Sequence, residues 1–102
     1  MALILVSEAT YPELQALNRD RVVPILPVGA VEAHGPHLPL CTDVIIAEAM
    51  VAAAANSLES NELDVLMLPP ISYTAAPFAQ GFTGTFSVSP ETVTGLIVDI
   101  TK

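Results

Sequence analysis

The sequence predicts an α/β protein with a parallel sheet. Two short apolar runs, residues 22–28 and 65–68, are typical of strands that are buried on both faces. An alanine-rich apolar run at residues 44–57 lies between them and has the length of a helix. Strand, helix and strand in this order form a βαβ unit, in which the two strands are almost always parallel.

The first elements of the chain are predicted from local signals. Residues 3–6 form a short apolar edge strand. Thr10 is predicted as the N-cap of a short helix, with Glu13 as its capping-box partner and Pro12 in the first turn. Leu14 and Leu17 are expected to form the buried stripe of that helix, and residues 18–21 a polar turn.

The strand at residues 22–28 contains Pro24, which has no N–H to donate to a neighbouring strand. We therefore expect either a bulge at Pro24 or pairing that begins at Ile25. Gly29 ends the strand, where the backbone must turn sharply. Thr42 and Asp43 are good N-cap residues for the helix at residues 44–57.

The second half of the chain continues the same pattern. A polar connection at residues 57–64 leads into the strand 65–68, which two prolines end. Residues 71–84 are predicted as a long ordered loop, a kind of segment that is usually functional, and residues 86–88 as a short strand. Ser89 and Pro90 then begin a final helix. Its apolar stripe is Val93, Leu96, Ile97 and Ile100.

That final helix is expected to have little to pack on. The sequence therefore resembles the N-terminal half of one α/β domain, spanning residues 1–102, rather than a complete domain.

Composition excludes several classes of function. The chain has 102 residues, a formal net charge of −8 and 52% hydrophobic residues. Nucleic acids and anionic membranes need clustered Lys and Arg, so neither is an expected partner. A single cysteine excludes an internal disulfide, and no apolar run is long enough to span a membrane. We expect a soluble cytoplasmic protein.

One stretch, residues 28–43, carries the chemistry: V-G-A-V-E-A-H-G-P-H-L-P-L-C-T-D. Glu32 and His34 are two residues apart, so in an extended segment both side chains can face one ion. Asp43 comes within reach if the loop folds back. Imidazole and carboxylate are ligands that zinc and manganese accept. This pattern predicts a metal site that has open positions for water.

Other interpretations of the same residues stay open. Asp43 is either a ligand or a helix N-cap. His34 and His37 are either site residues or buried neutral side chains that bond to backbone. Cys41 is either a thiolate ligand or, as we favour, a small buried core residue. Glu32 is harder to explain without a ligand, because a carboxylate after a buried strand needs a partner.

The same stretch resembles the signature of the creatininase (creatinine amidohydrolase) family, P-x-G-x-x-E-x-H-G-x-H-L-P-L-x-T-D. The later segments P-P-I-S-Y (residues 69–73) and G-F-T-G-T-F-S-V (residues 81–88) resemble the next conserved part of that family. The resemblance covers nearly the whole chain. It implies a three-layer α/β/α fold with a mainly parallel sheet and an assembly that is often hexameric. It also implies two divalent ions per complete site, zinc or manganese.

Carried over by position, the resemblance implies a role for each matching residue. Glu32 binds one ion, His34 binds the other, and Asp43 bridges them. His37 and Tyr73 are expected near the site, beside the ligands or the substrate. No residue of this chain is expected to be catalytic in its own right.

The implied activity is hydrolysis of a cyclic or linear amide C–N bond in a small molecule by a metal-activated water. Ala76, Phe78 and Ala79 replace polar residues of the relatives, which argues against creatinine as the substrate. The further ligands of the family lie downstream, so this chain alone is expected to be weakly active or inactive. The alternatives are a self-associating module without catalysis and a module that binds a single structural metal ion.

Overall fold

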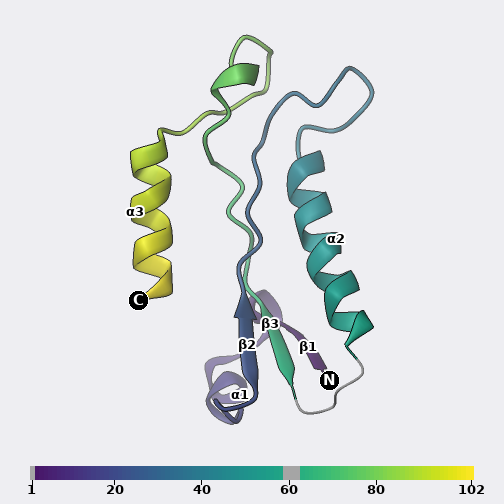
Figure 1. The fold of residues 1–102 in the computed structure, drawn as a ribbon, viewed down its shortest axis with the longest axis vertical. Helices are drawn as coiled ribbons and strands as arrows, with labels where there is room; N and C mark the ends of the chain where they lie inside the picture. Colours follow the sequence, from purple (N-terminus) through teal and green to yellow (C-terminus); the bar gives the residue numbers. More distant parts are fainter. Residues whose placement is uncertain (1, 59–62) are drawn as a thin grey trace. The chain divides into compact units, whose positions relative to one another are not determined.

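The computed structural model describes residues 2–58 and 63–102 (Figure 1). The chain divides into two compact units, which we describe separately. The first unit comprises Met1–Pro27 and Ala47–Pro70, and the second comprises Val28–Ile46 and Ile71–Lys102. The predicted polar connection at residues 57–64 lies partly outside the described residues.

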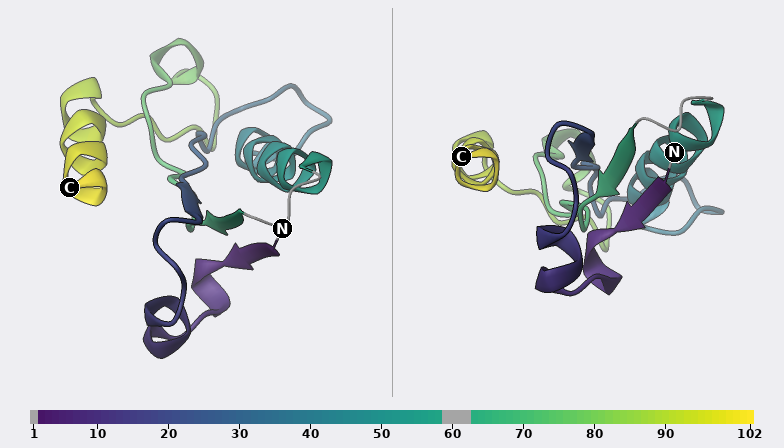
Figure 2. Two further views of the ribbon diagram at one scale, coloured as in Figure 1. Left: turned by 60° about the horizontal axis from the view of Figure 1, so that its bottom comes forward. Right: turned by 90° about the horizontal axis from the view of Figure 1, so that it is seen from below.

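The first unit is built on a parallel sheet. Its described strands are β1 (Ala2–Leu5), β2 (Val22–Ile25) and β3 (Asp64–Met67). β3 lies between β1 and β2 and pairs in parallel with both (Figures 1 and 2). Val65, in β3, is 2% exposed, as expected for the inner strand of a small core. The predicted α/β class with a parallel sheet is therefore confirmed, and so is the edge strand near the N-terminus.

Pro24 lies inside β2 without disturbing it. Both expectations for this residue, a bulge or pairing that begins at Ile25, are wrong, because the register with β3 is unbroken along the strand. N–H groups at the two ends of β3 donate to the carbonyl oxygens of Arg21 and Ile25, at 2.8 and 2.9 Å. Bonding positions alternate along a strand, so Pro24 points its missing N–H away from β3 and loses no ladder bond.

Helix α1 (Tyr11–Gln15) begins as predicted, with the Thr10 side chain accepting a hydrogen bond from the Glu13 N–H at 3.4 Å. Leu14 and Leu17 do not form a buried helical stripe. Leu17 follows the end of the helix, and both side chains are only half-buried. The polar turn that follows is confirmed by a backbone bond from Arg21 to Asn18.

Helix α2 (Thr42–Ser57) begins two residues earlier than predicted. The Cys41 carbonyl accepts the Ile45 N–H at 2.9 Å, which places Cys41 at the N-cap position. Thr42 and Asp43 therefore belong to the first helical turn, and neither is the cap. No helix among the described residues combines the length and the hydropathy needed to cross a membrane.

The second unit is organised around two extended segments that run side by side after β2 and β3 (Figure 1). Val28 and Ile71 form an isolated parallel bridge, and the N–H groups of Gly29 and Val31 donate to the second segment. The loop at residues 71–84 contains a short 3₁₀ helix, η2 (Pro77–Ala79). Residues 86–88 were predicted as a strand, and this is wrong: they make only separate backbone bonds to the two segments.

Helix α3 (Pro90–Thr101) begins as predicted, with Pro90 in its first turn and the Ser89 hydroxyl accepting the Thr92 N–H at 3.3 Å. The expectation that it has little to pack on is also confirmed, because none of its described residues is buried. Leu96 and Ile100, which belong to the predicted core stripe, are 43% and 40% exposed.

Candidate functional site

Glu32 lies on a backbone segment, residues 29–33, in which every N–H group donates a hydrogen bond, and His34 follows this segment directly. The N–H and carbonyl groups of the segment bond to partners from four other parts of the second unit. The bonds run from Gly29 N to Ile71 O, Ala30 N to Asp43 Oδ2, Val31 N to Ser72 O, Glu32 N to Leu40 O and Ala33 N to Thr85 Oγ1, at 2.8–3.1 Å. Thr74 and Phe86 add further bonds, to the carbonyls of Gly29 and Val31.

Gly29 is required at the start of this segment by a close approach of helix α2. A Cβ atom placed there would lie 2.9 Å from the Val44 backbone nitrogen, which is closer than real Cβ contacts. The sequence predicts a sharp turn at Gly29. The physical reason for glycine is this lack of space, since its φ angle is not positive.

Glu32 and His34 are brought together as predicted. Glu32 is 7% exposed, and its Oε1 lies 3.7 Å from the Nδ1 of His34. The two atoms are too far apart for a hydrogen bond. The two side chains form an ion pair only when the imidazole is protonated. A carboxylate and an imidazole placed in this way are donors of the kind that a divalent ion accepts.

Asp43 acts through its carboxylate, which accepts the Ala30 N–H at 3.0 Å. It is part-buried and lies in the first turn of α2, where the helix dipole favours a negative charge. The N-cap interpretation is wrong. Through this bond, Asp43 connects the start of the helix to Ala30. Glu32 follows Ala30 by two residues on the same segment.

The other predicted residues are not gathered around Glu32. His37 is exposed and lies against Gly35, so the interpretation of a buried neutral histidine is wrong for it. Tyr73 is 56% exposed and packs edge-to-face on Phe86, with ring centroids 6.0 Å apart. Cys41 is exposed at the start of α2, so the prediction of a buried core residue is wrong.

Within residues 2–58 and 63–102, no three His, Cys, Asp or Glu side chains are grouped in a way that could hold a metal ion. The structure therefore joins two of the predicted ligands, Glu32 and His34, and links the third, Asp43, through the backbone. These nitrogen and oxygen donors suit zinc or manganese. Together with the burial of Glu32, they are compatible with a divalent ion.

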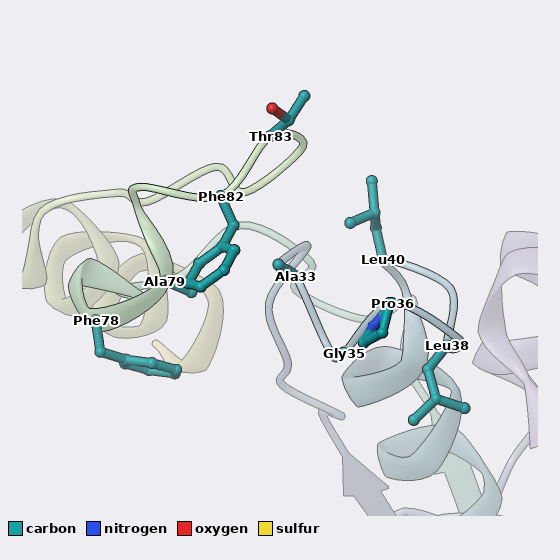
Figure 3. Close-up of a pocket in the computed structure, with 9 residues that line it drawn as sticks. All are labelled: Ala33, Gly35, Pro36, Leu38, Leu40, Phe78, Ala79, Phe82 and Thr83. Carbon is teal, nitrogen blue, oxygen red and sulfur yellow. The ribbon is translucent and has the colours of Figure 1, made fainter.

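An apolar pocket of about 560 Å³ opens beside this segment (Figure 3). Figure 3 shows Ala33 between two groups of side chains, one from the 71–84 loop and one from the loop that precedes α2. None of these described lining residues is charged. They are Ala33, Gly35, Pro36, Leu38, Leu40, Phe78, Ala79, Phe82 and Thr83. Ala33 and Gly35 flank His34, so the pocket and the predicted ligand share one segment.

Sequence reasoning missed two hydroxyl groups at this site. Thr74 donates to the Gly29 carbonyl, and Thr85 accepts the Ala33 N–H, both at 2.8 Å. These partners are 45 and 52 residues apart in the sequence. No local pattern connects them, because the topology alone brings the segments together.

Comparisons with known proteins identify the family of the chain. The family model for Creatininase (creatinine amidohydrolase) matches residues 7–102. The mycofactocin precursor peptide peptidase of Mycobacterium tuberculosis (strain CDC 1551 / Oshkosh) is 40% identical over 80 residues, which cover 74% of this chain and 32% of that protein. The creatinine amidohydrolase of Pseudomonas putida is 30% identical over 100 residues, which cover 97% of this chain and 38% of that protein.

Solved structures give the same result. A crystal structure of creatinine amidohydrolase (creatininase) superposes with a TM-score of 0.77 at 32% identity, over 95% of this chain and 38% of that one. A putative creatinine amidohydrolase from Bacteroides fragilis NCTC 9343 gives 0.78 at 28% identity, over 96% and 39%. The chain thus spans 32% to 39% of the length of these relatives. On the family match, the identities and the shared fold, this chain belongs to the creatininase family.

Proposed function

We propose that this chain contributes metal ligands to a hydrolase that cleaves an amide C–N bond. Glu32, His34 and Asp43 are the proposed ligands, and zinc or manganese are the proposed ions, two per complete site. The observation that carries the proposal is the buried Glu32 carboxylate with the His34 imidazole 3.7 Å away. Membership of a family whose named relatives are hydrolases supports the reaction class.

The proposed division of work follows from the contacts. A bound divalent ion would supply Lewis acidity, activating water and polarising the amide carbonyl. Glu32 would contribute negative charge from a side chain that is largely shielded from water, where electrostatic interactions are stronger than in bulk solvent. Asp43, bonded to the Ala30 N–H, keeps the segment that carries Glu32 at a fixed place beside the first turn of α2. We propose supporting roles beside the ligands or the substrate for His37 and Tyr73.

The proposed substrate is a small-molecule amide, cyclic or linear, with an apolar group beside the bond that is cleaved. The uncharged lining of the 560 Å³ pocket supports an apolar group, because an ionic group there would lose its hydration without gaining a partner. The named substrates of the relatives differ, a precursor peptide in one protein and creatinine in another. Both contain an amide-type C–N bond, which is the chemistry that they share.

Calorimetric titration of the chain with zinc and with manganese tests the proposed ligands. We expect Glu32→Gln to lose most of the binding, because the amide has no charge. Glu13→Gln is the matched control, since Glu13 is exposed near the start of α1. Equal binding by Glu32→Gln and by the unmodified chain would remove Glu32 from the ligand set.

A second candidate is a self-associating module without catalysis. The observation that favours it is a pair of exposed apolar side chains on one face of α3, Leu96 and Ile100, which are 43% and 40% exposed. Light scattering with and without chelator separates the candidates. An assembly that is indifferent to chelator, in a chain that binds no metal, would support the module. Unfolding of the chain by chelator would indicate a single structural ion instead.

A further inference from the structure

Thr85 lies at the centre of the candidate site without belonging to the proposed ligand set. Its hydroxyl oxygen accepts the Ala33 N–H at 2.8 Å, and the contact is part-buried. Ala33 stands between Glu32 and His34 in the sequence. The next residue after Thr85, Phe86, donates its N–H to the Val31 carbonyl at 3.0 Å. The Thr85 hydroxyl and the Phe86 N–H therefore bond to the backbone on either side of Glu32.

We propose that Thr85 is a positioning residue, whose hydroxyl fixes the directions in which Glu32 and His34 point. The Ala33 N–H belongs to the planar peptide unit that joins Ala33 to Glu32. A hydrogen bond to that N–H sets the orientation of the peptide plane, and with it the backbone angles on both sides. The inference rests on the proposed function, because a fixed Glu32–His34 pair matters most when the pair holds an ion.

The position of the hydroxyl is set by the residue before it. Gly84 has a φ angle of +90°, which residues with a side chain rarely adopt. A Cβ atom there would also lie 2.5 Å from Leu40 Cδ1. Leu40 in turn accepts the Glu32 N–H through its carbonyl, at 3.1 Å. Thr85 and Leu40 thus hold consecutive N–H groups of the chain, those of Ala33 and Glu32, and the fold places both partners together.

The test uses the 102-residue chain and the variants Thr85→Val and Thr85→Ser. Valine has nearly the shape of threonine but cannot accept a hydrogen bond, whereas serine keeps the hydroxyl. Thr94→Val is the matched control, because the Thr94 hydroxyl also bonds to backbone, at 2.9 Å, in α3. Three quantities are measured by NMR and calorimetry: exchange of the Ala33 amide, the Glu32–His34 side-chain NOE, and zinc affinity.

In Thr85→Val we expect the Ala33 amide to exchange about fivefold faster or more, as for the loss of one hydrogen bond. The Glu32–His34 NOE should weaken, and zinc affinity should fall about 10- to 100-fold, the usual effect of removing a group that orients a metal ligand. Thr85→Ser should restore all three quantities. Thr94→Val should leave them unchanged.

An unchanged NOE and unchanged Ala33 exchange in Thr85→Val would overturn the inference, whatever the metal result. If Thr85→Val loses its fold by circular dichroism, Thr85→Ala is measured in the same way and decides. If the unmodified chain binds neither zinc nor manganese, the proposal that this chain holds an ion without further ligands fails. The metal-free NOE and exchange data then still decide whether Thr85 positions the pair.

Discussion

At the scale of single residues, the buried carboxylate of Glu32 is expected to lower the stability of the metal-free chain while it favours metal binding. Glu32 is 7% exposed, and the His34 imidazole 3.7 Å away balances its negative charge only when it is protonated, so we expect the burial of Glu32 to cost stability in the metal-free chain. We expect Glu32→Gln to raise the free energy of unfolding by about 1 kcal/mol in the absence of metal. Urea denaturation beside Glu13→Gln measures this. A clear loss of stability in Glu32→Gln alone would show that the charge is already well compensated.

Asp43 is expected to behave in the opposite way. Asp43→Ala leaves the part-buried Ala30 N–H without its partner, and bonds to charged groups contribute about 1.5–3 kcal/mol. We expect a loss of that size in urea denaturation and a smaller loss for Asp43→Asn, which keeps an acceptor oxygen. Asp99→Ala is the control, because the Asp99 side chain is 78% exposed. Equal losses for Asp43→Ala and Asp99→Ala would contradict the structural role of the bond.

The sequence predicts single residues well where the signal is local. The E-x-H spacing brings Glu32 and His34 together as expected, because two residues suffice to define their relation. It predicts Asp43 as a ligand or a cap but misses its bond to Ala30, which is 13 residues away. Thr85 is missed altogether, since its partner is 52 residues away and no pattern within a segment reports it.

At the scale of elements, two glycines in different surroundings test the account of the turn after β2. Gly29→Ala places a Cβ atom 2.9 Å from a backbone nitrogen of α2, whereas Gly95→Ala, within α3, has no atom within 4 Å. We expect Gly29→Ala to lower stability. Gly95→Ala should raise stability by about 0.5–1 kcal/mol, the usual difference between these residues in a helix. Thermal unfolding of both variants measures the contrast, and the same sign of change in both would refute it.

The N-cap of α3 provides an element-scale prediction of its own. The Ser89 hydroxyl accepts the Thr92 N–H, and no described residue of the helix is buried. With little packing to hold it, α3 depends on its cap, so Ser89→Ala should weaken the helix by about 1 kcal/mol. Hydrogen exchange should show faster exchange in α3 and unchanged exchange in β3. Equal changes in both elements would mean that α3 unfolds only with the whole chain.

Elements were predicted correctly where apolar runs and caps agree, as in β3 and at the first turn of α3. The errors have physical causes. Helix α2 starts earlier than predicted because the Cys41 carbonyl accepts the Ile45 N–H, which makes Cys41 the cap and frees Asp43 for a distant partner. Residues 86–88 have strand-like composition, yet they bond to two different segments and form no ladder.

At the scale of the whole molecule, exposed apolar side chains predict association between copies of the chain. Leu96 and Ile100, which share one face of α3, are 43% and 40% exposed. We expect light scattering to show species larger than a monomer and a melting temperature that rises with concentration. Leu96→Glu with Ile100→Glu should shift the chain toward monomer. A monomer at all concentrations in the unmodified chain would exclude this surface as an interface.

The measurement that tests the central claim most directly is metal content per chain, on protein purified without chelator, beside Asp43→Ala and Asp99→Ala. The proposed site predicts zinc or manganese in the unmodified chain and in Asp99→Ala, with loss of metal in Asp43→Ala. Metal retained in Asp43→Ala would leave Asp43 with a structural role only. No metal in the unmodified chain, even after zinc or manganese is added, would contradict the claim that these residues form a metal site within this chain, without further ligands.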